Sequence, residues 1–277
     1  MGFRVGFLWL FILFSAMMAY STARADQVAD TFSKFTTGSV IKVDHSAWDG
    51  LLKTYVKPAE SGLNVVDYGR FKAEARNKLT AYLDQLQKTH VTKLNKREQY
   101  AFWVNLYNAK TVAIILEHYP VKSIRDIDIS PGLFSNGPWK KKVVTVKGTD
   151  LSLDDIEHVI LRGFWKDNRV HYAVNCASIG CPNLAIAAFT GDNLDQMLDE
   201  GARAYVNSPR GVKIEGNRLL VSKIYSWFSK DFGNSEADLL THLRRYAGPK
   251  LSEKLKSFTD IDKYVYDWNL NGIEAQS

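Results

Sequence analysis

The chain has 277 residues, of which 45% are apolar and 24% charged, and this is an ordinary composition for a globular protein. Its formal net charge is +6, and the basic residues are dispersed along the chain. A charge this small and scattered excludes a protein that binds nucleic acid through a basic surface.

The first 25 residues have the pattern of a secretory signal peptide. Arg4 supplies a positive charge, residues 5–19 form an uncharged apolar run, and Ala23-Arg24-Ala25 is a small-x-small cleavage pattern. The apolar run is shorter than the roughly 20 residues that span a membrane, so cleavage is favoured over an uncleaved anchor, which stays the alternative. The sequence therefore predicts an exported protein, periplasmic or secreted, with no stable membrane span after cleavage.

Residues 26–47 are polar and weakly patterned, and we expect them to be a lead-in to a single globular domain over 48–271, with a short tail at 272–277. Within 70–88, Leu79, Tyr82, Leu83 and Leu86 recur at spacings of three and four, which predicts an amphipathic helix.

The next helix is the central one. Asn95 and Glu98 form a capping-box-like start, and Pro120 prevents the helix from continuing beyond His118. Residues 100–116 between these signals are apolar nearly all round, and a helix without a polar face is buried.

The second half of the chain mixes strand and helix signals. A strand is expected to end at 147–148, Ser152 to cap a helix over 153–164, and an alternating strand to follow at 170–175. Further expected elements are helices at 192–206, 224–228 and 236–246, and a hairpin over 212–222 that turns at Gly216-Asn217. This order predicts an α+β fold, in which a buried central helix and several amphipathic helices pack on a small, largely antiparallel sheet.

Two asparagines interrupt the apolar central helix. Asn105 and Asn108 lie three residues apart and face the same way. Buried amides need partners, so they either bond to the backbone of neighbouring loops or line a polar cleft and orient a substrate. Together with Trp103 and Tyr107 on the same helix, they are candidate site residues.

The only two cysteines lie in RVHYAVNCASIGCPNLA, residues 169–185. In an oxidising compartment, a disulfide between Cys176 and Cys181 is the simpler prediction. The alternative is a nucleophilic Cys176 with His171 or His158 as its base. Residues five apart on a strand point to opposite faces, so His171 meets Cys176 only if the strand breaks before the cysteine.

Other motifs point to no cofactor and no metal. The cysteine pair lacks a second pair of closely spaced ligands, so no zinc site is expected. Glu157-His158 lacks the second histidine of a metalloprotease motif, which favours helix packing. Asp231-Phe232-Gly233 matches a kinase tripeptide without the accompanying kinase motifs, so we interpret it as a chance match.

Several stretches together resemble the family catalogued as domain of unknown function 547. They are AFWVNLYNAKTV, YPVKSIRDI, LSLDDIEHVILR, RVHYAVNCASIGCPNL, VSKIYSWFSKDFG and YDWNLN. The resemblance extends from about Trp48 to Asn271 and implies no particular activity. It does imply that the histidine, the Asn175-Cys176 pair and the helix asparagines occur together, which favours a common site. A distant likeness to papain- and transglutaminase-type proteins concerns architecture alone, because their nucleophilic cysteine starts the central helix.

Two functions follow from these patterns. The favoured one is an exported binding or assembly factor for a small molecule, peptide or envelope component, with a polar pocket beside a Cys176–Cys181 disulfide loop. The alternative is a thiol-dependent hydrolase or acyl transferase, in which Cys176 attacks a carbonyl. There, amides of Asn105, Asn108 or Asn175 would stabilise the developing oxyanion.

Overall fold

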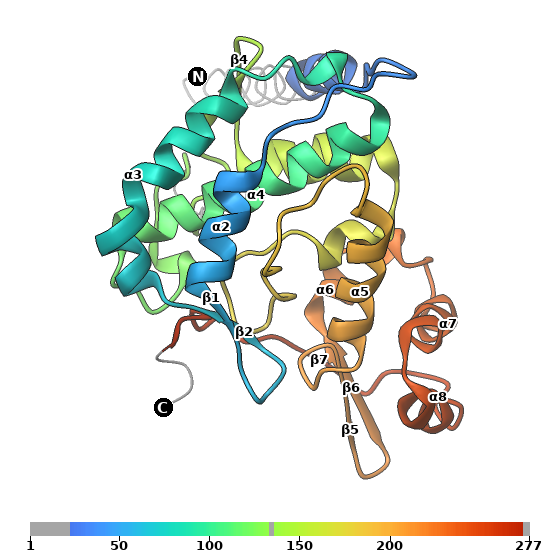
Figure 1. Ribbon diagram of the computed structural model, residues 1–277. Helices are drawn as coiled ribbons and strands as arrows, with labels where there is room; N and C mark the ends of the chain where they lie inside the picture. The colour runs from blue at the N-terminus through green and yellow to red at the C-terminus, as the bar shows by residue number, and fades with distance from the viewer. Residues whose placement is uncertain (1–22, 133–135, 274–277) are drawn as a thin grey trace, which may run out of the picture.

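The computed structural model describes residues 23–132 and 136–273 (Figure 1). Most of the expected signal peptide, residues 1–22, lies outside the described residues, as does most of the expected tail. The described part contains helices and small sheets, which confirms the α+β prediction.

Helix α4, Lys96–His118, is the buried centre of the fold, as the sequence predicted. The Asn95 side chain accepts hydrogen bonds from the backbone N–H groups of Arg97 and Glu98, and the helix ends just before Tyr119-Pro120. The Glu98 carboxylate does not complete a capping box. It accepts instead from the N–H groups of Val43 and Gly191, and so fixes two loops to the start of the helix.

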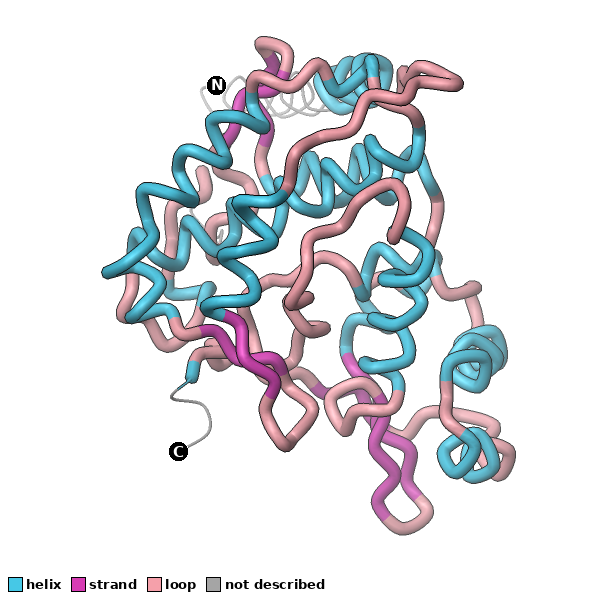
Figure 2. Tube along the Cα trace, viewed as in Figure 1, coloured by secondary structure: helices cyan, strands magenta, loops and turns pink. Residues whose placement is uncertain are grey.

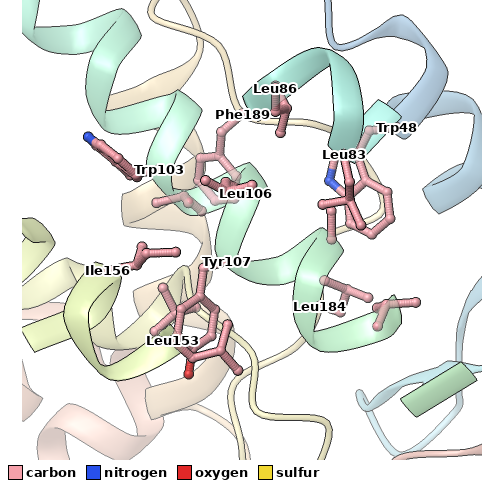
Figure 3. Packing of buried hydrophobic residues seen from close by; sticks show 14 of the residues in the cluster. Trp48, Leu83, Leu86, Trp103, Leu106, Tyr107, Leu153, Ile156, Leu184 and Phe189 are labelled. Carbon is pink, nitrogen blue, oxygen red and sulfur yellow. The ribbon is translucent and has the colours of Figure 1, made fainter. Parts of the chain in front are cut away.

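Two helices, α2 (Ser46–Tyr55) and α3 (Tyr68–Gln87), belong to the core around α4. Figure 3 shows Trp48 and Leu83 on one side of α4, and Leu153 and Ile156 on the other. The Trp48 ring stacks on Tyr82 with 6.1 Å between centroids. Burial of these large rings is the main contribution to the stability of this part of the molecule.

The segment expected as a lead-in also contributes to the core. Residues 23–32 are helical, and Val28 and Phe32 are buried. The Phe32 ring meets Trp103 edge-on, with 5.0 Å between centroids. Packing therefore begins before Trp48, and two apolar residues four apart in a polar stretch were too weak a pattern to indicate it.

Within residues 23–132 and 136–273, the strands form three small sheets and not one (Figure 2). Strand β1 (Val56–Pro58) pairs with β2 (Asn64–Val66), and β3 (Val144–Val146) pairs with β4 (Thr149–Leu151), both antiparallel. The predicted hairpin is confirmed as β5 (Val212–Glu215) and β6 (Arg218–Ser222), and it projects from the body of the molecule. Strand β7 (Lys263–Val265) adds to β6 in parallel.

Further helices lie in the second half of the chain. They are η3 (Asp155–Trp165), which has π-type spacing, and α5 (Leu194–Val206), α6 (Lys223–Trp227), α7 (Glu236–Tyr246) and α8 (Pro249–Leu255). Short 3₁₀ turns lie at η1 (Val91–Lys93), η2 (Ile124–Asp126) and η5 (Ser229–Asp231). Within the described ranges, no helix is long and apolar enough to cross a membrane.

The strand predicted at 170–175 is wrong. Residues Asn168–Tyr172 form a 3₁₀ helix, η4, capped by the side chain of Asp167. After it, the Ala173 carbonyl and the Asn175 N–H both bond to the side chain of Asn108 on α4, at 2.9 and 2.8 Å. A side chain thus takes the place of a neighbouring strand as the hydrogen-bond partner of this backbone.

The segment after β7 runs back between distant parts of the chain. Leu270 N–H donates to the Lys122 carbonyl at 2.8 Å, and Asn271 N–H donates to Ala177 at 3.1 Å. The Asn271 carbonyl accepts from Val66 on β2, and its side chain accepts from the Tyr68 hydroxyl at 2.7 Å. This segment ties the first helices to the cysteine loop.

Candidate functional site

A cavity of about 170 Å³ opens beside the cysteine loop. A cavity of about 150 Å³ is large enough to hold a benzene molecule, so this one accepts a small group of a ligand. Its wall brings together reactive side chains from α4, η3, η4 and the cysteine loop: Tyr107, Glu157, His158, His171, Cys176 and Cys181.

The Cys176 thiol is half-buried and has three hydrogen-bond partners. Its sulfur lies 2.8 Å from the Cys181 sulfur, 3.0 Å from the Tyr266 hydroxyl and 3.3 Å from Ser178 Oγ. The hydrogen bond with Cys181, followed by those with Ser178 and Tyr266, lowers the pKa of the Cys176 thiol despite burial. Donors that favour the thiolate make this sulfur the reactive one of the pair.

The Cys181 thiol has the opposite character. It is buried, and burial raises its pKa well above the usual range. Its sulfur also accepts a hydrogen bond from the Cys176 N–H at 2.9 Å. The two sulfurs are not covalently joined in this structure, so the disulfide expected from the sequence stays a prediction.

The loop between the cysteines is fixed from several sides. The Asn175 side chain donates to the Pro182 carbonyl and accepts from Ala177 N–H, while Arg210 donates to the Cys181 carbonyl at 2.6 Å. Gly180 lies against the backbone of Asp267, where a Cβ would be 2.8 Å from the nitrogen. These contacts hold the loop without a covalent bond between the sulfurs.

The His171 imidazole is buried and oriented by an acid. Its Nε2 lies 2.7 Å from Asp231 Oδ2, which also accepts from Arg162 Nε at 2.6 Å, and its ring stacks on Phe228. Burial works against the charged Asp231, but the hydrogen bonds from His171 and Arg162 outweigh it and hold the pKa of that carboxyl well below its usual range. Burial lowers the pKa of His171. A neutral ring that donates from Nε2 keeps Nδ1 as an acceptor.

His171 and Cys176 line the same cavity. The argument that they point to opposite faces assumed a strand, and the 3₁₀ helix η4 followed by a turn removes that assumption. The imidazole is not among the thiol's hydrogen-bond partners, which are Cys181, Ser178 and Tyr266. The two side chains therefore share the cavity without a direct hydrogen bond.

The helix asparagines bond to backbone. Asn105 donates to the Phe189 carbonyl at 2.7 Å and accepts from the Phe189 N–H at 3.1 Å. Asn108 donates to the Ala173 carbonyl and accepts from the Asn175 N–H. Asn105, Asn108 and Asn175 do not line the cavity. The two helix asparagines instead hold neighbouring loops against α4.

The aromatic and histidine candidates divide between cavity and core. Tyr107 lines the cavity, whereas Trp103 packs between Phe32 and Phe102 in the core. His158 also lines the cavity, and its Nδ1 accepts from Arg162 at 3.1 Å.

Several site residues were missed from the sequence. Asp231 belongs to the DFG tripeptide interpreted as a chance match, Glu157 belongs to a pair assigned to helix packing, and Tyr266 was not among the candidates. All three lie in stretches that carry the family resemblance, which was the signal available. Among the described residues, no three His, Cys, Asp or Glu side chains are grouped to hold a metal ion.

Comparison with known proteins gives one match. No curated protein and no solved structure matches the chain. The family described as "Protein of unknown function, DUF547" matches over residues 91–206, a segment that contains α4, η3, His171 and both cysteines. The match confirms the resemblance to this family over residues 91–206.

Proposed function

We propose that the cavity is the active site of a thiol-dependent hydrolase or acyl transferase. The observation that carries the proposal is the shared cavity of an acid-oriented imidazole, His171, and a half-buried thiol, Cys176, whose pKa is lowered. Nucleophile, base and orienting carboxylate are the three groups that cysteine-based acyl transfer requires.

The chemistry follows from these positions. His171 Nδ1 takes the thiol proton, directly or through one water, and the Cys176 sulfur attacks the carbonyl carbon of the substrate. The resulting imidazolium donates this proton to the leaving group, and a thioester to Cys176 forms. Water or an acceptor then loses a proton to His171 and attacks the thioester, which restores the thiol. Asp231 stabilises the imidazolium but is not itself protonated.

The proposal includes an exported location, because residues 1–25 have the pattern of a signal peptide. In an oxidising compartment the reduced pair is the active form, since a Cys176–Cys181 disulfide leaves no nucleophile. The short distance between the two sulfurs, 2.8 Å, supports a second candidate. In that candidate the pair is oxidised, and the protein is a binding or assembly factor with the cavity as its ligand site.

Acylation of the full chain separates the two candidates. The protein is isolated from the exported fraction with its thiols counted before and after denaturation. It is then exposed to p-nitrophenyl acetate, and the modified residue is located by mass spectrometry. We expect acetylation of Cys176 that is lost in Cys176→Ser and kept in Cys181→Ser. Asp231→Asn, which keeps the shape of the side chain, should slow it by roughly 10²-fold.

The thiol-enzyme proposal fails if both cysteines are oxidised as isolated and the reduced protein is not acetylated at Cys176. In that case the serine variants should merely lower the melting temperature, as removal of a structural disulfide does.

A further inference from the structure

The charged groups on the wall of the cavity are mainly acidic. Asp154 and Glu157 on its wall are acidic, the histidines are His158 and the neutral His171, and no Lys or Arg lines it in the described part of the chain. Ionisation of Cys176 adds a further negative charge to the same space.

Glu157 shows this imbalance most clearly. The residue is 8% exposed, and its ion-pair partner is His158, whose Nδ1 lies 3.8 Å away and already accepts from Arg162. Burial raises the pKa of the neighbouring Asp154; the charges of His158 and Lys140 oppose this rise, and the charge of Glu157 adds to it. A buried carboxylate without a cation is costly, so a positively charged ligand group is stabilised here.

Aromatic rings supply the second requirement for such a ligand. Trp139, Trp227, Tyr266 and Trp268 line the cavity, and Trp227 is 45% exposed. The Trp227 ring lies 4.8 Å from Tyr266 and 5.6 Å from Trp268, between centroids, so the three form one continuous aromatic wall. Arg125, which is outside the cavity lining, already lies 5.3 Å over the Trp268 ring. Faces of Trp and Tyr rings attract ammonium groups.

We propose that this cavity binds a cationic amine, as a primary or quaternary ammonium group held between the aromatic wall and the carboxylate of Glu157. The identification of a substrate rests on the proposed function: the substrate would be a carbonyl compound that carries this amine close to the carbon attacked by Cys176. The identification of a ligand site does not, because a binding protein could use the same cavity for a cationic amine.

Binding of the cation should also activate the thiol. The negative charge of Glu157 raises the pKa of Cys176 and so opposes the hydrogen bonds that lower it. A cation bound against Glu157 offsets that charge and shifts the thiol toward thiolate. Ligand binding and nucleophile activation are then linked through one carboxylate.

The test compares choline with its uncharged isostere, 3,3-dimethyl-1-butanol. Binding is measured by tryptophan fluorescence and calorimetry on the full chain carrying Cys176→Ser, which removes any reaction at the thiol. We expect choline to bind roughly tenfold more tightly than the isostere. Glu157→Gln and Trp227→Leu should each weaken choline several-fold. Glu157→Gln should leave the isostere unchanged.

The control variant is Glu60→Gln, which removes one negative charge from an exposed turn outside the cavity lining. Melting temperatures show whether each variant is folded. A second measurement follows the thiolate absorbance of the reduced wild-type protein as a function of pH. The pKa of Cys176 should fall when choline is added and stay constant with the isostere.

Equal affinity for choline and its isostere, or no binding of choline and methylammonium, would overturn the inference. If Cys176 is nonetheless acetylated, the thiol-enzyme proposal stands without it. If choline binds and no acyl probe reacts, the cation site stands and belongs to a binding protein.

Discussion

At the scale of a single residue, the Tyr266 hydroxyl connects the C-terminal part of the chain to the Cys176 thiol. It lies 3.0 Å from the Cys176 sulfur and 2.9 Å from Ser178 Oγ. A hydroxyl in this position donates to the thiolate more strongly than to the thiol, because hydrogen bonds to charged groups are the stronger ones.

Tyr266→Phe should therefore raise the pKa of Cys176 by about one unit, since such a bond contributes about 1.5 kcal/mol or more and one unit equals about 1.4 kcal/mol. The pH dependence of thiolate absorbance in reduced protein measures this value. Tyr264→Phe is the matched control, because that hydroxyl lies two residues earlier and contacts Glu236. Equal pKa values in both variants would show that Tyr266 does not stabilise the thiolate.

Residue type alone identified part of the site and missed the rest. Cysteine and histidine are rare in this chain, so His171 and Cys176 were obvious candidates. Asp231 reaches His171, and Tyr266 reaches Cys176, only through tertiary packing, from positions 50 or more residues beyond Cys181. Apart from the family resemblance, nothing near them in the sequence indicated the contacts, because spacing along the chain carries no information about such distant pairs.

At the scale of elements, α4 organises the site through its asparagines. The side-chain amide of Asn108 bonds to the backbone of Ala173 and Asn175, as a neighbouring strand would. Both residues lie within three positions before Cys176. One side chain thus sets the path of the backbone between His171 and the thiol.

Asn108→Ala should leave a buried carbonyl and a buried N–H without partners, and so lower the free energy of unfolding by about 2–4 kcal/mol. Urea denaturation of the full chain measures this loss. Asn77→Ala on the exposed face of α3 is the control and should have no destabilising effect, because alanine favours a helix. A loss equally small in both variants would contradict the role given to Asn108.

Elements with local start and stop signals were predictable. Helix α4 begins and ends where Asn95 and Pro120 indicate. Ser152 Oγ accepts from the Asp155 N–H, as a cap should, although the helix η3 that follows has π-type spacing. The 3₁₀ turn η4 was not predictable. A short apolar alternation fits a strand equally well, and the partner of this backbone lies on another element.

At the scale of the whole molecule, buried histidines make stability depend on pH. Burial lowers the pKa of His45 and His242 to about 4. The unfolded chain binds these protons near pH 6.5, so below that value the unfolded state holds more protons than the folded state. The stability contribution is complete above pH 6.5 and is lost as the pH falls toward 4.

Lowering the pH from 7.5 to 4 should reduce the free energy of unfolding by up to roughly 3 kcal/mol for each of these histidines. Urea denaturation across this range measures the slope. His45→Gln should flatten it, whereas the same substitution at the exposed His90 should leave it unchanged. A slope identical in the wild type and His45→Gln would exclude His45 as a source.

The path of residues 266–271 determines when the site comes into existence during synthesis. Translation produces the thiol and the imidazole some 90 residues before Tyr266, the hydroxyl that lies 3.0 Å from the Cys176 sulfur. The ribosome must also release Asn271 before the cysteine loop is tied to α3 through its contacts with Ala177 and Tyr68. The cavity of a nascent chain is therefore incomplete until the last residues of this segment are synthesised. A stop codon directly before Tyr266 would leave helices α2 to α8 encoded but remove part of the cavity wall.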